Sequence, residues 1–79
     1  MEDTRQILHF LKGWLTGEDT PVPIGVFISE ARKKTSEPSA RAICSRVQLL
    51  LAEYSTGHLD EAELRRATID DFRGELLTL

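Results

Sequence analysis

Apolar residues at the start of the chain recur with helical spacing. Between Thr4 and Thr16 they share one arc of about 160° on a helical wheel. The residues on this arc are Ile7, Leu8, Phe10, Leu11, Trp14 and Leu15. Asp3 or Thr4 can cap the start, and Gly17 suits a left-handed stop. The pattern therefore predicts a first amphipathic helix over residues 4–16.

The same spacing predicts two further helices. Thr20 followed by Pro21 is a suitable cap and first helical position. Proline has no N–H, and an N–H in the first turn has no partner within the helix in any case. The second helix runs from there to about Lys34, and its apolar stripe contains Ile24, Phe27, Ile28 and Ala31. The third helix is predicted over 38–55, and its stripe contains Ala40, Ile43, Cys44, Val47, Leu50, Leu51 and Tyr54.

The last quarter of the chain opens with a strong cap signal. Asp60, followed three residues later by Glu63, has the pattern of a capping box. Beyond it the apolar residues change phase: Leu64 and Ala67 share one face, and a rotated stripe contains Ile69, Phe72 and Leu76. Thr68 ahead of two aspartates resembles a second cap. We therefore predict a helix over 61–67, a kink or split near Thr68, and a last helix over about 69–77.

These elements predict the fold class. No segment alternates with period two over a useful length, so we expect no strand. Four amphipathic helices on short connections predict an all-α protein, a small antiparallel four-helix bundle that forms one domain over residues 1–79. With 41% hydrophobic and 29% charged residues, the composition is that of an ordinary globular protein.

Composition also bears on location. The longest uninterrupted apolar run, over 49–52, is far below the roughly 20 residues that cross a bilayer. Acidic residues follow Met1, whereas a secretory signal begins with basic ones. A single cysteine cannot form an internal disulfide, which small secreted domains usually need. We expect a cytoplasmic protein with no membrane partner.

The sequence offers little chemistry. His9 and His58 have no second ligand at metal-binding spacing, and Cys44 lies on the apolar stripe of the third helix. The glycines form no phosphate-binding run. We therefore predict no metal, no cofactor and no catalytic residue, and we expect a protein that binds rather than an enzyme.

Charge and exposed apolar residues suggest candidate surfaces. Residues 30–46 hold five basic and two acidic residues, whereas residues 53–79 hold three basic and seven acidic ones. A basic cluster could contact phosphates: Arg32, Lys33, Lys34 and Arg41. Three apolar residues point away from their own stripes and would form a partner or dimer surface if they cluster in space: Val22, Val26 and Leu49.

The order of features resembles that of the bacterial colicin-D-like immunity family. The resemblance rests on the segments 7–17 (ILHFLKGWLTG) and 50–66 (LLAEYSTGHLDEAELRR), with an aromatic second helix around Phe27 between them. Members are small acidic helical proteins that block a toxin by covering its active-site face. The resemblance implies a basic nuclease toxin domain as partner. By position, the acidic contacts would be Asp60, Glu61, Glu63, Asp70, Asp71 and Glu75.

Two other functions are open at this point. The chain could be a helical adaptor or homodimerisation module that uses its off-stripe apolar residues. A small nucleic-acid-binding regulator is less favoured, because no aromatic residues accompany the basic cluster. Salt-dependent retention on nucleic acid would distinguish that function from the others.

Overall fold

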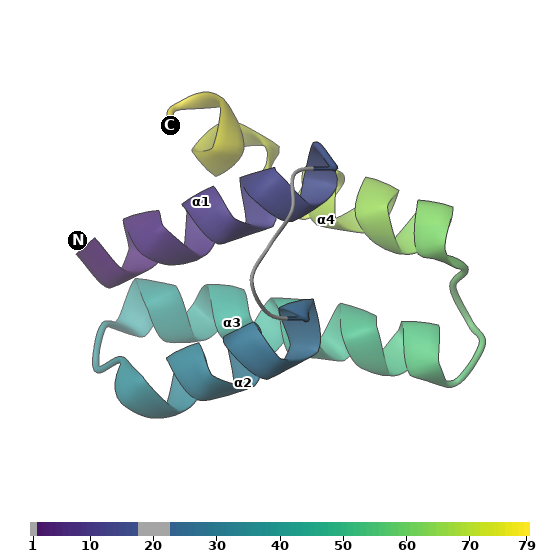
Figure 1. The fold of residues 1–79 in the computed structure, drawn as a ribbon, viewed down its shortest axis with the longest axis horizontal. Coiled ribbons are helices and arrows are strands. Elements are labelled where there is room, and N and C mark those ends of the chain that lie inside the picture. Colours follow the sequence, from purple (N-terminus) through teal and green to yellow (C-terminus); the bar gives the residue numbers. More distant parts are fainter. Residues whose placement is uncertain (1, 18–22) are drawn as a thin grey trace.

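The computed structural model describes residues 2–17 and 23–79. These residues form four helices, α1 (Glu2–Leu15), α2 (Ile24–Lys34), α3 (Pro38–Ser55) and α4 (Glu61–Leu77), and they contain no strand. Consecutive helices run in opposite directions, as the sequence colouring in Figure 1 shows. The predicted all-α bundle is confirmed.

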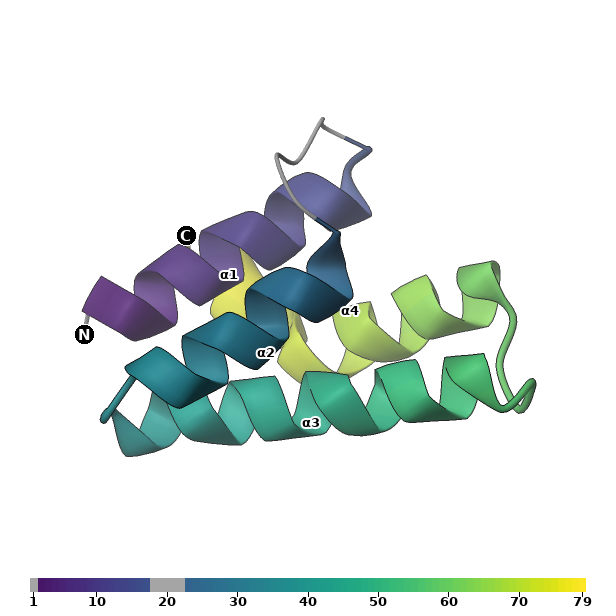
Figure 2. The same ribbon diagram turned by 60° about the horizontal axis from the view of Figure 1, so that its bottom comes forward.

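The helices α1 and α3 each contact the other three helices, whereas α2 and α4 do not contact each other. Figure 2 shows α1 and α2 stacked along α3, with α4 behind them. Because α4 does not reach α2, it leaves the outer surface formed by α2 and α3 uncovered.

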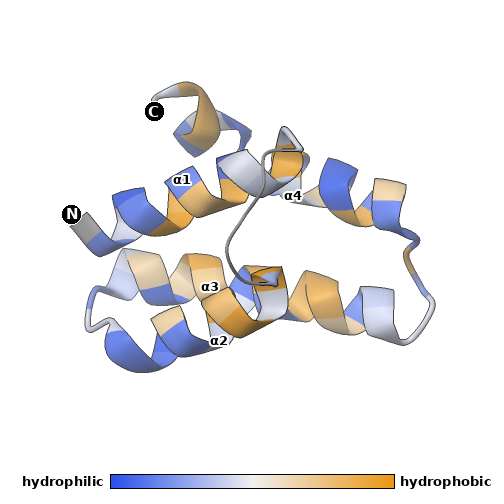
Figure 3. Cartoon of the chain, in the orientation of Figure 1, coloured by the Kyte–Doolittle hydropathy of each residue, from blue (hydrophilic) through white to orange (hydrophobic). Residues whose placement is uncertain are grey.

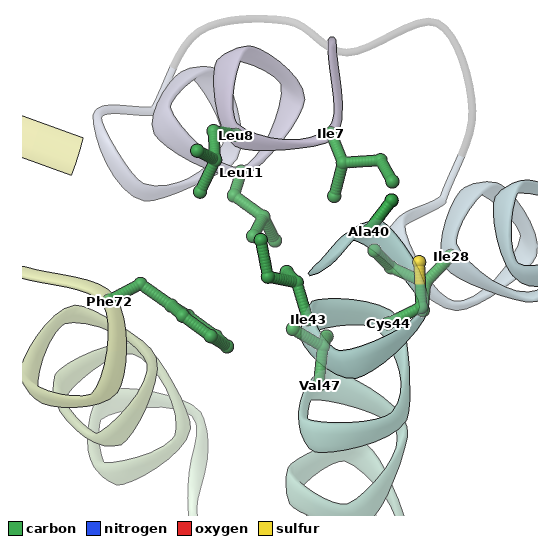
Figure 4. Packing of buried hydrophobic residues seen from close by; sticks show 9 residues of the cluster. All are labelled: Ile7, Leu8, Leu11, Ile28, Ala40, Ile43, Cys44, Val47 and Phe72. Atoms are coloured by element: carbon green, nitrogen blue, oxygen red, sulfur yellow. The ribbon is translucent and has the colours of Figure 1, made fainter. Parts of the chain in front are cut away.

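One apolar cluster joins all four helices. Its buried members are Ile7, Leu8 and Leu11 from α1, Ile28 from α2, Ala40, Ile43, Cys44 and Val47 from α3, and Phe72 from α4. Figure 4 shows these side chains pointing toward one another. Figure 3 shows the corresponding hydrophobic colour mainly on the inward surfaces of the helices. Burial of this apolar area drives folding.

The start of α1 differs from the prediction. The helix begins at Glu2, so Asp3 and Thr4 lie inside its first turn and do not cap it. Instead they bind the connection between α2 and α3. Thr35 Oγ1 donates to Asp3 Oδ2 at 2.7 Å, and Thr4 donates to Glu37 Oε2 from its hydroxyl at 2.9 Å and from its backbone N–H at 3.3 Å.

Thr35 provides a test of this polar contact. Its hydroxyl also accepts from Glu37 N at 3.2 Å, and the residue is 6% exposed. We expect Thr35→Val to lower the free energy of unfolding by about 1–3 kcal/mol, because two polar groups lose a partner where water has little access. Urea denaturation measures this. Thr78→Val is the control, since Thr78 is exposed; equal losses in both variants would contradict the prediction.

The structure tests only part of the prediction for the start of α2. The predicted cap, Thr20 with Pro21, lies outside the described residues. The helix in the structure begins at Ile24 after Pro23, and no side chain caps it. Phe27 N–H donates to the Pro23 carbonyl at 3.1 Å, which is the first backbone hydrogen bond of the helix.

The helix α4 confirms the capping box and corrects the position of the kink. Glu63 N–H donates to Asp60 Oδ1 at 2.8 Å, and Asp60 N–H donates to Glu63 Oε1 at 3.0 Å. The helix then continues through Thr68, which is fully buried and donates to the Leu64 carbonyl at 2.8 Å. This bond satisfies the hydroxyl within the helix, so Thr68 does not act as a second cap.

The kink occurs at Phe72, where φ is −119° and ψ is 20°. After it, the end of the chain lies beside α1 in both views (Figures 1 and 2), and Leu76 and Leu79 pack against the core. The position of the kink also explains a second correction. Leu64, Thr68 and Phe72 form the buried line of α4, whereas Ile69 is 38% exposed.

Tyr54 was predicted on the core stripe of α3, but it is 44% exposed. It lies in the last turn of α3, which extends past the ends of α1 and α2 (Figure 1). Tyr54 has the same helical phase as the core residues of α3. Its side chain is exposed because α1 and α2 end before this last turn of α3.

Candidate functional site: two grooves beside α2

The first concave surface lies between α1 and α2, and we call it the α1/α2 groove. It has a volume of about 290 Å³ and is lined by Asp3, Gln6, Ile7, Phe27, Glu30, Ala31, Lys34 and Thr35. Three of these residues are apolar, and two exposed residues of opposite charge, Glu30 and Lys34, lie on α2 one helical turn apart. The groove thus combines an apolar lining with ionic groups.

Phe27 gives this groove a rigid wall. Its ring stacks on that of Phe10, with the ring centres 3.8 Å apart and the planes 5° from parallel. Neither Glu30 nor Lys34 forms a salt bridge with another described residue. A groove of this kind can hold an apolar side chain and pair with charges on either side of it.

The second concave surface lies between α2 and α3, and we call it the α2/α3 groove. It has a volume of about 400 Å³ and is lined by Ser29, Arg32, Lys33, Arg41 and Gln48. Arg32 Nη1 donates to Gln48 Oε1 at 2.9 Å. None of the residues assigned to this groove is acidic, so the groove is positively charged.

The structure divides the predicted basic cluster. Arg32, Lys33 and Arg41 meet in the α2/α3 groove, whereas Lys34 lines the α1/α2 groove. Lys33 and Lys34 are about 100° apart on the helix, so adjacent residues face different grooves. Sequence reasoning missed Ser29 and Gln48. Their helical spacing from Arg32 and Arg41, three and seven residues, was the available signal.

The acidic residues of α4 are mostly engaged within the chain. Asp60 and Glu63 form the capping box. Glu61 pairs with Arg65 at 3.4 Å, and Asp70 pairs with Arg73 at 2.8 Å along the same helix, whereas Asp71 pairs with Arg46 of α3. Glu75 is exposed. Asp70 and Asp71 therefore lie on different sides of α4, the second toward α3.

Arg65 explains part of this arrangement. Its guanidinium lies 4.8 Å from the centre of the Trp14 ring, and its Nη1 donates to the Trp14 carbonyl at 2.6 Å. That carbonyl belongs to the last turn of α1, where the helix leaves carbonyls without an internal partner. Glu61 and Arg65 thus help to join α4 to the end of α1.

Two of the three off-stripe apolar residues can be placed. Val26 on α2 is 49% exposed and Leu49 on α3 is 50% exposed, which confirms that both point away from the core. Neither lines one of the two grooves. Val22 lies outside the described residues, so the surface formed by these three residues stays a prediction.

Cys44 is fully buried in the core cluster. Burial raises the pKa of its thiol, and the charge of Arg32 offsets part of that effect. A buried thiol with a raised pKa is a poor nucleophile, because the thiolate is the reactive form. Cys44 therefore serves as a small core residue.

The raised pKa predicts how stability changes at high pH. In the unfolded chain the thiol releases its proton near pH 8.5, whereas the folded protein keeps it to higher pH. The contribution of Cys44 is complete below that value and is lost as pH rises through the folded pKa. We expect the free energy of unfolding to fall above about pH 8.5 more steeply in the wild type than in Cys44→Ala, because the pKa of the thiol is raised in the folded protein. Parallel declines in urea titrations would contradict this.

The described residues contain neither a metal-binding cluster nor a membrane-spanning helix. Within residues 2–17 and 23–79, no group of three or more His, Cys, Asp or Glu side chains is placed to hold a metal ion. In the same part of the chain, every helix is too short or too polar to cross a membrane. Comparisons with protein-family models, with curated protein sequences and with solved structures found no match for this chain.

Proposed function

We propose that this chain is a small helical protein that acts by binding another protein, without catalysis, and that it binds its partner in the α1/α2 groove. The observation that carries the proposal is the combination of apolar and unpaired ionic groups in that groove. Ile7, Phe27 and Ala31 supply apolar lining, and Glu30 and Lys34 are free to pair. The cytoplasm suits a chain whose single thiol is buried and reduced.

The partner segment follows from the shape and charge of the groove. A volume of about 290 Å³ accommodates one or two side chains, so the segment inserts an apolar residue as its anchor. Charged residues on either side of that anchor pair with Glu30 and Lys34. Contacts of this type provide affinity through the buried anchor and selectivity through the surrounding charges.

Inhibition of a basic nuclease toxin is the narrower form of the proposal. Its expected contacts are the acidic residues of α4, five of which already bond within the chain. Three of the five, Glu61, Asp70 and Asp71, are in surface ion pairs, which are weak and exchange readily, so these three carboxylates remain available to a basic partner. We assign them a supporting role in encounter and place the principal contact in the α1/α2 groove.

Site-specific cross-linking in the native host tests the proposal. A photoreactive amino acid replaces Gln6, which is exposed and lines the groove, and in the control it replaces Arg66, which is exposed on α4. We expect the first probe, and not the second, to capture one defined partner protein. Recovery of the same partner from the control position only would contradict the proposed groove.

Binding of the purified partner then distinguishes the two surfaces. Exchanging the charges by Glu30→Lys with Lys34→Glu leaves the net charge unchanged, and we expect it to weaken binding about tenfold or more. The matched control is Asp70→Arg with Arg73→Asp on α4, for which we expect less than about a twofold change. The reverse order would favour an acidic-face inhibitor, and a cross-link only to a second copy of the chain would indicate a homodimer.

A further inference from the structure

The α2/α3 groove is a second site, separate from the proposed protein-binding groove. Three cationic side chains from two helices meet there, and Lys33 and Arg41 form no salt bridge with any other described residue. The acidic helix α4 packs on α3 and α1 but does not contact α2. The positive charge in this groove therefore lacks a neighbouring carboxylate among the residues that line it.

One hydrogen bond orients donors in this groove. Arg32 donates to the side-chain oxygen of Gln48 across the two helices. Because arginine has only donors, this bond requires the amide oxygen of Gln48 to face Arg32 and leaves its NH₂ group available. Ser29 supplies a hydroxyl from the same face of α2. The lining thus offers guanidinium, ammonium, amide and hydroxyl donors to one concave volume.

We propose that the α2/α3 groove binds a phosphate monoester. Such a group carries a charge of about −1.5 to −2 at neutral pH and has three acceptor oxygens, which matches three cations and several donors. Arginine forms paired hydrogen bonds with phosphate oxygens. The monoester belongs either to a phosphorylated side chain of a protein or to a small phosphorylated metabolite.

The lining favours a single phosphate group over a nucleic-acid strand. None of the residues that line the groove is aromatic, so it lacks a surface on which bases would stack. A strand also needs a basic stripe that follows many phosphates. Here three basic residues line one compact groove, and the chain carries a net charge of −3.

The adjacent lysines Lys33 and Lys34 on α2 allow a matched test of phosphate binding, because they line different grooves. We expect the backbone amides of Ser29, Arg32, Arg41 and Gln48 to shift in a saturable way when a short phosphoserine peptide or adenosine monophosphate is added to the isotopically labelled full chain. Lys33→Gln should weaken binding about tenfold, because one charged contact is lost. Lys34→Gln removes the same charge one residue away, but in the other groove, and should change the affinity less than about twofold.

Several results would overturn this inference. These are an equal loss in both lysine variants, shifts of the same size with the unphosphorylated peptide, and tighter binding of duplex DNA than of either monoester. Circular dichroism is used to check that both variants are folded. A higher affinity for the peptide than for adenosine monophosphate identifies a phosphorylated protein as the source, and the opposite order identifies a metabolite. Lys33 lies outside the α1/α2 groove, so loss of phosphate binding in Lys33→Gln leaves the proposed protein-binding function intact.

Discussion

Replacing Leu11 by alanine should lower the free energy of unfolding by about 2–5 kcal/mol. Leu11 is fully buried, and Figure 4 shows its side chain in the middle of the cluster, directed toward Ile43 of α3. The variant loses the transfer free energy of the side chain and leaves a cavity that surrounding helices fill only in part. Small domains have total stabilities of about 5–15 kcal/mol, so this loss is a large fraction of the whole. Urea denaturation followed by circular dichroism measures it.

Leu49→Ala is the matched control for this prediction. It removes the same atoms from a side chain that is 50% exposed on the outer face of α3. We expect a change within about 0.5 kcal/mol, as for most surface substitutions. Similar losses in the two variants would mean that Leu11 is not a central core residue or that Leu49 is covered by a second copy. Repeating the control at different protein concentrations separates these explanations.

Phe72→Ala should lower the free energy of unfolding by about 3–5 kcal/mol. Phe72 is the residue of α4 in the main cluster, and it lies at the kink. Its ring also positions the segment after it, through which Leu76 and Leu79 pack against the core. We therefore expect backbone amides after residue 72 to exchange with solvent faster in the variant, in addition to the overall loss of stability.

Ile69→Ala is the control for Phe72. The apolar pattern of the sequence assigns both residues to one stripe, but the structure leaves Ile69 38% exposed. We expect the Ile69 variant to lose less than half as much stability as the Phe72 variant, because partly exposed side chains gain less from burial. Equal losses would support the stripe predicted from sequence and contradict the kink position in the structure.

The error at Thr68 shows where local sequence patterns stop being informative. Threonine ahead of two aspartates is a typical helix start, and the change of apolar phase suggested a break at the same place. In the folded chain the hydroxyl bonds to the Leu64 carbonyl and the helix continues. The same residue can cap a helix or lie within it. Packing against α3 and α1 determines which of the two occurs, and this packing is not a local property.

The candidate grooves show the same limit. The sequence identified the basic residues of α2 and α3, but it grouped Lys34 with them and omitted Ser29 and Gln48. Helical phase places Lys33 and Lys34 about 100° apart, yet only the positions of α1 and α3 on either side of α2 give each lysine a different groove. The acidic residues of α4 were recognised individually. The pairs Glu61–Arg65 and Asp70–Arg73 follow helical spacing, whereas the pair of Asp71 with Arg46 depends on how α4 lies against α3.

The sequence alone determined the helical class, the approximate bounds of four helices and most of the core, because apolar periodicity and caps act over a few residues. The tertiary structure decided the kink at Phe72, the exposure of Tyr54 and Ile69, and the contacts of Asp3 and Thr4 with the connection after α2. It also decided the composition of both grooves. These features depend on how one helix lies against another, which a helical repeat does not specify.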